Sequence, residues 1–227
     1  MRSGYNEGPL NKLPPIVWIL AAPIIIGELM FGLGQAGLFQ NGVVWRAEAL
    51  QRFAYDPNLM RAMMEAGVHP WRQMARVVTY PFVHGSFTHA AFVLVFILAL
   101  GKMVGEVFRG WAVAVVFFAS SILAALIYTA LPFTQGALYG GYPAAYGLIG
   151  AFSFIQWTYL GATRGNRMQA FQLIGFLMGI QLLFSLIFGG TDQWIADLSG
   201  FIVGFVVSFF VSPGGWGRVL AKLRNRR

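Results

Sequence analysis

The sequence predicts an all-α, polytopic membrane protein whose six membrane-spanning helices pack into one bundle. Its composition, the length of its charge-free runs and the placement of its Lys and Arg residues predict this fold class. Of the 227 residues, 57% are hydrophobic and 11% are charged, whereas a soluble domain has about 25% charged residues. So few charges cannot cover the surface of a soluble protein of this size. The 21 Phe residues exclude a disordered chain, and the lack of Cys excludes a disulfide scaffold.

Each predicted span is a charge-poor run, since about 20 apolar residues carry a helix across ~30 Å of hydrocarbon. The run over 111–163 holds no charge and is too long for one helix, so Pro132 and Pro143 divide it. Glu28 interrupts the first span and Asp197 the last. Within one domain of residues 1–227, the predicted spans are 16–38, 86–108, 111–130, 143–160, 169–190 and 193–212.

The placement of Lys and Arg predicts the orientation, because cytoplasmic loops carry an excess of both. Apart from the first loop, 39–85, all 11 remaining Lys and Arg residues lie in segments that are cytoplasmic if the N-terminus is inside. The outer segments 131–142 and 189–193 hold none. We expect an integral protein of a bacterial plasma (inner) membrane with both termini cytoplasmic. The basic cytoplasmic tail, 213–227, would meet anionic lipid headgroups rather than nucleic acid.

The first loop is expected to fold into short helices on the outer side of the bundle. Its apolar residues recur at helical spacing over 43–54, and amphipathic helices of this kind lie in the membrane interface. Pro57 can start a second short helix that runs through Met64. In the predicted loop helix over 43–54, three charged residues fall mainly on faces other than the apolar one: Arg46, Glu48 and Arg52.

Motifs in the order of a known family follow this loop. A Trp71-Arg72 pair precedes a His-x-Ser-x-x-His pattern that starts at His84 and ends at His89. The stretch 146–151 and a Gly200-x-x-x-Gly204 motif follow on the predicted fourth and sixth spans. Over roughly residues 60–212, this arrangement resembles the rhomboid intramembrane serine proteases. The resemblance implies a rhomboid-like bundle of six helices with a large folded first loop and a cytoplasmic N-terminus.

The resemblance also implies four catalytic positions, of which three carry a different side chain here. Tyr142 stands at the position of the nucleophilic Ser, Asp197 at that of the general-base His and Val93 at that of the oxyanion Asn. His89, the other oxyanion donor, is retained. Val cannot donate a hydrogen bond, and loss of one oxyanion donor costs ~10²–10³ in rate. Carboxylates, with a pKa of ~3.9, are also poor bases for a phenol, whose pKa is ~10.

The sequence therefore predicts a pseudoprotease that binds the transmembrane helices of client proteins and steers their folding, degradation or trafficking. One alternative is an active rhomboid endopeptidase that uses non-standard groups, such as Ser153 or Ser199. A second is a proton or small-solute pathway through Glu28, His89 and Asp197, because intramembrane ionisable residues often mark such pathways. We expect no cofactor and no metal, since the His residues lack ligand spacing.

Contacts are also predicted for the remaining polar and Gly residues. Asp197 is expected to accept a hydrogen bond from Tyr142, which would join the fourth and sixth spans. Glu28 either forms a functional site or contacts His84, His89 or Gln35.

The Trp71-Arg72 pair is expected to brace the first loop or to bind a partner. The motifs Gly175-x-x-x-Gly179 and Gly200-x-x-x-Gly204 are expected to permit close helix packing.

Overall fold

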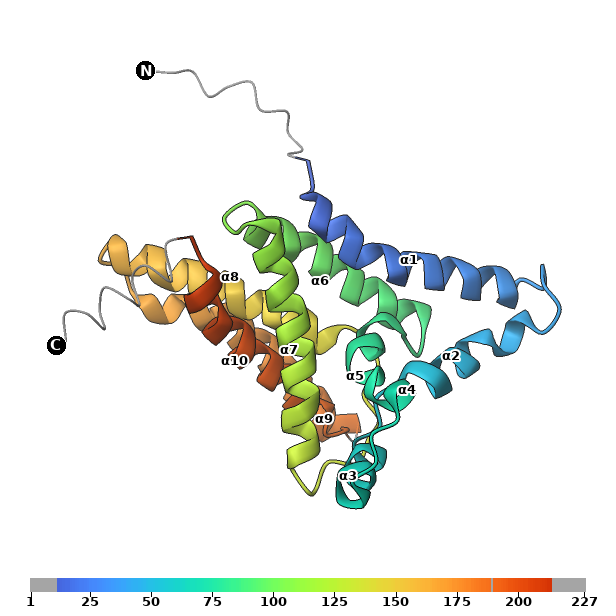
Figure 1. Ribbon diagram of the computed structural model, residues 1–227. Helices are drawn as coiled ribbons and strands as arrows, with labels where there is room; N and C mark the ends of the chain where they lie inside the picture. The colour runs from blue at the N-terminus through green and yellow to red at the C-terminus, as the bar shows by residue number, and fades with distance from the viewer. Residues whose placement is uncertain (1–11, 189, 214–227) are drawn as a thin grey trace.

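The computed structural model describes residues 12–188 and 190–213, and within these residues the fold is helical with no β-strand. The described part holds six helices of 17 residues or more (Figure 1). Each predicted span overlaps one of them, and the bounds differ from the predicted ones by three residues at most. These helices are α1 (Pro15–Gln35), α6 (Phe87–Gly105), α7 (Gly110–Ala130), α8 (Tyr142–Ala162), α9 (Gln172–Phe188) and α10 (Gln193–Val211).

Membrane-spanning character is clearest in α1, α6, α7 and α10, which combine at least 18 residues with a mean hydropathy of 2.0 to 2.3. Helix α8 has 21 residues and no charge, and α9 has 17 residues. Long helices form in these runs because a backbone in hydrocarbon must satisfy its own polar groups. The prediction of an all-α membrane bundle is confirmed.

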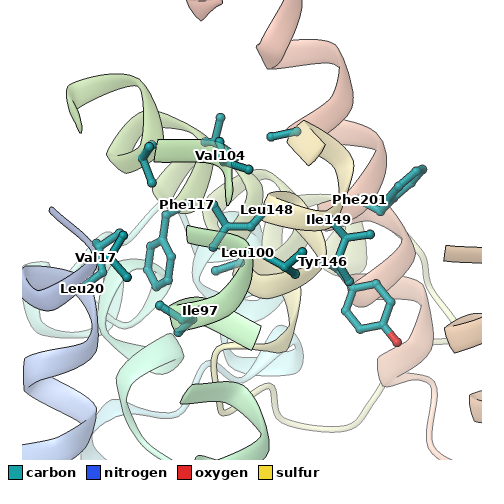
Figure 2. Packing of buried hydrophobic residues seen from close by; sticks show 14 of the residues in the cluster. Val17, Leu20, Ile97, Leu100, Val104, Phe117, Tyr146, Leu148, Ile149 and Phe201 are labelled. Atoms are coloured by element: carbon teal, nitrogen blue, oxygen red, sulfur yellow. The ribbon is translucent and has the colours of Figure 1, made fainter. Parts of the chain in front are cut away.

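Helix α8 lies at the centre of the bundle, where it packs against α6, α7 and α10. Its N-terminal half, 143–151, is buried throughout. Figure 2 shows Leu148 and Ile149 of α8 in the core with Ile97 of α6, Phe117 of α7 and Phe201 of α10. The segment that follows the predicted nucleophile position is therefore continuously buried.

Glycines allow α8 and α10 to approach closely. A Cβ atom at Gly204 would collide with the carbonyl oxygen of Gly147, and one at Gly200 would collide with that of Pro143. The prediction of close packing at Gly200-x-x-x-Gly204 is confirmed. For Gly175 and Gly179 it is wrong, because a Cβ atom at either would meet no other described atom within 4 Å.

The first loop folds into short helices, as predicted. They are η1 (Gly42–Val44), α2 (Trp45–Phe53), α3 (Pro57–Ala66), α4 (Trp71–Met74), α5 (Arg76–Thr79) and η2 (Tyr80–Phe82).

Hydrogen bonds tie this loop to the bundle. Asp56 caps α3 by accepting from the N–H groups of Asn58 and Leu59. Arg61 donates to the carbonyl oxygens of Thr129 at 2.8 Å and Leu131 at 2.7 Å, and so fastens α3 to the end of α7. A third 3₁₀ turn, η3 (Arg167–Phe171), precedes α9 and explains its late start.

Candidate functional site

The backbone turn before α8 packs against two histidines. Gly140 has a φ of +89°, in the left-handed region that favours glycine, and a Cβ atom there would lie 2.5 Å from Nε2 of His89. The next residue, Gly141, donates its N–H to Nε2 of His84 at 3.3 Å. His84 therefore holds the chain at the point where α8 begins.

Tyr142, the first residue of α8, lies face to face with His89. The ring centroids are 5.0 Å apart and the planes differ by 16°. The buried Val93 lies one turn further along α6, behind Gly141. Nε2 of His89 is buried and has no hydrogen-bond partner among the described residues. Three of the four predicted catalytic positions, at Tyr142, His89 and Val93, are thus brought together at the start of α8.

Asp197 lies on α10, is 4% exposed, and takes a different partner from the predicted one. Its Oδ2 accepts a hydrogen bond from Nε2 of Gln181 on α9 at 2.8 Å. Oε1 of Gln181 in turn accepts from the hydroxyl of Tyr146 on α8 at 3.1 Å. No hydrogen bond joins Tyr142 to Asp197 in the described part of the chain, so the predicted direct pair is wrong. The ring of Tyr142 stacks on His89 instead. The carboxylate of Asp197 is bonded to the side-chain amide of Gln181 on α9.

A cavity of about 560 Å³ opens between α6 and α9 and reaches this polar chain. Helix α9 packs only loosely on α8 and α10. Apolar side chains from α6 and α9 form the walls, and polar side chains from α8, α9 and α10 form the floor. The walls are Phe92, Phe96, Leu177 and Ile180, and the floor is Tyr142, Tyr146, Gln181 and Asp197. The candidate site is therefore a cleft with apolar walls and a polar floor.

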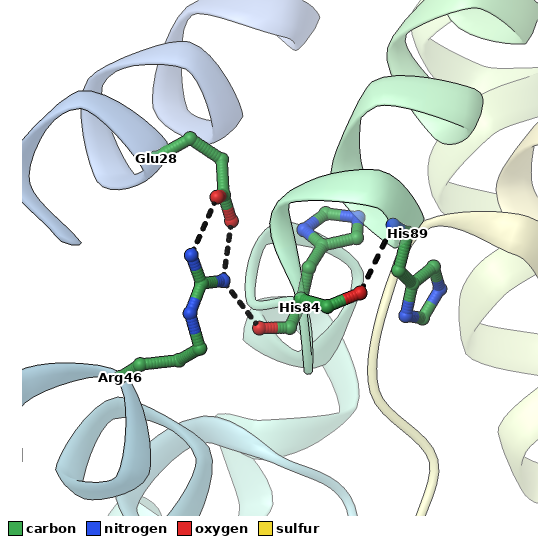
Figure 3. Close-up of polar contacts among 5 residues, drawn as sticks. Glu28, Arg46, His84 and His89 are labelled. Atoms are coloured by element: carbon green, nitrogen blue, oxygen red, sulfur yellow. Dashed lines mark hydrogen bonds and ion pairs between the residues drawn. The ribbon is translucent and has the colours of Figure 1, made fainter. Parts of the chain in front are cut away.

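Glu28 forms a buried ion pair with Arg46 of α2 (Figure 3). The two carboxylate oxygens accept from Nη1 and Nη2 of Arg46 at 2.8 and 2.7 Å. Nη1 also donates to the carbonyl oxygen of His84 at 2.9 Å. The partners predicted for Glu28 are thus wrong, since Arg46 turns inward instead of lying on an outer face. The pair joins α1, the first loop and the segment that holds His84.

His84 is a neutral base in this arrangement. Burial, together with the neighbouring His89 and Arg46, lowers the pKa of His84 from 6.5 to about 3. Its Nε2 is the acceptor for Gly141, and a proton there would remove that acceptor. Within the described residues, no group of three or more His, Asp or Glu side chains could hold a metal ion.

Trp71 and Arg72 lie on the surface of the first loop. Trp71 is 74% exposed, and the guanidinium of Arg72 lies over its ring at 5.8 Å. No hydrogen bond or ion pair joins Arg72 to the bundle in the described part of the chain. Arg61 and Arg46 brace the loop in its place, and a partner for the exposed pair stays a prediction.

A comparison with protein-family models shows the family of this chain. A family model described as the Rhomboid domain matches residues 71–214, which is more than half of the chain. The chain belongs to the rhomboid family. In the comparison with curated proteins, no match was found.

The residues at the predicted catalytic positions make the following contacts. At the predicted nucleophile position, the phenol ring of Tyr142 stacks on His89, whose Nε2 has no described hydrogen-bond partner. At the predicted general-base position, Asp197 is bonded to the amide of Gln181. The N–H of Gly141, next to Tyr142, donates to His84. Ser153 and Ser199 are both buried in the helices α8 and α10 and line none of the described cavities.

Three residues of this region were not identified from the sequence: Arg46, Tyr146 and Gln181. Gln181 carried a usable signal, because it is an amide in the middle of a charge-free run, whereas Gln169 and Gln172 lie at the start of that run. A buried amide in a membrane helix needs a partner, and Asp197 was the available unpaired group on the next helix. Arg46 carried no such signal in the sequence, because the amphipathic pattern of α2 placed it among the outward-facing charges.

Proposed function

We propose that this rhomboid-family membrane protein is a pseudoprotease whose cleft between α6 and α9 receives a transmembrane segment of a client protein. By holding that segment, it steers the client's folding, degradation or trafficking. One observation carries the proposal: the cleft has apolar walls for a helix, while its floor presents hydrogen-bonding side chains and no activated nucleophile.

The walls suit a transmembrane helix because they are aromatic and aliphatic. Phe92 and Phe96 lie on one face of α6, four residues apart, and Leu177 and Ile180 face them from α9. Packing of this kind, together with interhelical hydrogen bonds, drives helix association in lipid.

The floor suits recognition rather than hydrolysis. A hydroxyl attacks a carbonyl only when a base within hydrogen-bond reach removes its proton. The carboxylate of Asp197 is instead bonded to Gln181, and Gln181 to Tyr146. Such a chain of polar groups can accept or donate to a polar residue, or to an unwound backbone, in the client segment.

The solute-pathway alternative loses one of its three groups to the ion pair described above. Glu28 is bonded at both oxygens to Arg46, so it offers no free carboxylate. His89 and Asp197 stay as candidates, and only Asp197 lines the cleft.

Site-specific photo-crosslinking in proteoliposomes tests the proposal with a general rhomboid substrate as the probe. Photoreactive residues at Phe92 and Ile180 line the cleft, whereas Val95 on α6 and Phe176 on α9 are exposed controls outside it. We expect adducts with the uncleaved transmembrane segment at the first two positions only. Equal adduct yields at all four positions would contradict docking in the cleft.

The location and orientation belong to the same proposal. We place the protein in a bacterial plasma membrane with both termini cytoplasmic. Reporter fusions after Arg167 and Arg227 should then read cytoplasmic and one after Gln135 external. The basic tail proposed to meet anionic headgroups lies, from residue 214 onward, outside the described residues.

A further inference from the structure

A second cavity, of about 430 Å³, lies between α1 and α2 and shares no lining residue with the cleft at Asp197. The two helices diverge from the turn that joins them, with α5 facing the opening (Figure 1). Its walls come from α1, α2 and η2 and are almost wholly apolar. They include Pro23, Gly27, Phe31, Trp45, Ala49 and Phe82. No step in the proposed client binding uses this cavity.

Two opposite charges stand on the rim of this cavity. Glu48 and Arg52 both line it, both are exposed, and they lie one turn apart on α2. Residues at this spacing commonly form an ion pair. Here neither side chain has an ion pair or hydrogen bond to any described residue. Arg46 of the same helix shows the contrast, because both its Nη atoms are bonded to Glu28.

The residues around the cavity suit an apolar environment. Helix α1 has the length and hydropathy of a membrane span. Beside the cavity, the turn between α1 and α2 exposes Leu38, Phe39, Val43 and Val44. Water is a poor occupant for an apolar cavity because it finds too few polar partners there. A hydrocarbon chain matches the walls.

We propose that this cavity binds a zwitterionic aminophospholipid, with one acyl chain between α1 and α2. Its phosphate contacts the guanidinium of Arg52, whose planar fork of N–H donors can bond two phosphate oxygens at once. Its ammonium group contacts the carboxylate of Glu48. The same carboxylate disfavours a purely anionic headgroup, so the rim selects a lipid that carries both charges.

Native mass spectrometry of the delipidated, full-length protein tests this site. The probes are dioleoyl phosphatidylethanolamine and dioleoyl phosphatidylglycerol, each titrated separately. The wild type should bind the ethanolamine lipid more tightly. Arg52→Gln should weaken that binding about tenfold or more, because it removes the charged hydrogen bonds to the phosphate. Arg72→Gln removes the same charge elsewhere in the first loop and should leave binding unchanged.

A cavity-filling variant tests the acyl chain. A Cβ atom at Gly27 meets only Phe31, at 3.8 Å, so Gly27→Leu can place its side chain in the cavity. It should also weaken binding about tenfold, whereas Gly32→Leu on the same helix, where a Cβ atom meets nothing within 4 Å, should not.

Equal binding of the two lipids would overturn the proposal, as would unchanged binding in Arg52→Gln. A photo-crosslink from Ala49 to a second polypeptide, rather than to lipid, would also overturn it. Arg52→Gln changes only an exposed side chain and keeps the test valid if Gly27→Leu fails to fold.

Discussion

At the scale of single residues, Asp197 is a buried carboxylate near the start of α10. A buried charge is costly unless a partner or a cavity compensates. The described partner is Gln181, whose amide bridges Asp197 and Tyr146 across three helices. The stability of this region therefore depends on an amide from α9 and not on Tyr142.

A double-mutant cycle tests that pairing. Gln181→Leu leaves the Asp197 carboxylate without its donor and should destabilise the protein by ~1–3 kcal/mol. Asp197→Leu should also destabilise it, and the double variant should cost less than the sum of the two, because both polar groups leave together. Thermal unfolding in detergent measures each variant.

Tyr142→Phe is the matched control for this cycle. Its hydroxyl has no described bond to Asp197, and its ring still stacks on His89. We expect a change within about 0.5 kcal/mol. A larger loss for Tyr142→Phe, or strict additivity between Gln181→Leu and Asp197→Leu, would contradict the pairing.

His84 predicts a dependence of stability on pH. Its pKa is about 3 in the folded protein against 6.5 ordinarily. Between these values the unfolded chain binds a proton that the folded chain does not. Stability should therefore fall as pH drops from about 6.5 toward about 3, by up to ~1.4 kcal/mol per pH unit from this group, and show no such loss above 6.5.

Unfolding of His84→Gln across the same pH range checks this prediction. The Gln variant keeps an acceptor for the N–H of Gly141 but has no proton to gain. Its stability should fall less steeply with acid than that of the wild type. Parallel curves for the two proteins would show that His84 does not carry the effect.

The sequence was sufficient to locate the unusual residues but not their partners. Glu28 and Asp197 stood out because charges are rare in apolar runs. Which group meets them depends on how each helix is rotated about its axis and on how the first loop folds back. To predict the pairing of Glu28 with Arg46, both the helix rotation and the fold of the loop must be known, because the two residues lie 18 positions apart in the sequence, on either side of a turn.

At the scale of elements, the contact between α8 and α10 organises the bundle. Carbonyl oxygens of α8 lie where Cβ atoms of α10 would be, so small residues are required at Gly200 and Gly204. The sequence predicted this packing from a Gly-x-x-x-Gly spacing. The same spacing failed at Gly175 and Gly179, because spacing shows that close approach is possible and not that a neighbour is present.

A pair of Gly→Ala substitutions separates these two cases. Gly204→Ala places a Cβ atom against the backbone of Gly147 and should cost ~1–3 kcal/mol through overpacking. Gly179→Ala adds a methyl group into open space and should be neutral or stabilising by up to about 1 kcal/mol, because Ala favours a helix. Thermal unfolding of the two variants should differ in this order, and a reversed order would contradict the described packing.

Element bounds followed closely from the sequence because apolar run length, Pro and Gly control where a membrane helix can begin and end. The first loop was predicted to hold two short helices, and it holds further turns between 71 and 82. Those turns are fixed by tertiary bonds and not by periodicity. Tyr80 of η2, for instance, donates its hydroxyl to the carbonyl oxygen of Ser121 on α7 at 2.8 Å.

At the scale of the whole molecule, two cavities in the described part of the rhomboid bundle differ in their chemistry. One lies between α6 and α9 over the chain of Tyr146, Gln181 and Asp197, and the other between α1 and α2 beneath Glu48 and Arg52. The first occupies the place where the family resemblance puts peptide hydrolysis. The central claim is that this cleft keeps its shape for a client helix and has lost the nucleophile.

Labelling of the purified protein with a serine-directed fluorophosphonate probe tests that claim most directly. The account predicts no covalent labelling, because Tyr142 stands at the predicted nucleophile position and no described side-chain base is hydrogen-bonded to the buried Ser153 or Ser199. An active rhomboid protease, assayed in parallel, provides the positive control. Specific labelling of the wild type that disappears in Ser153→Ala or Ser199→Ala would contradict the account and restore an active endopeptidase.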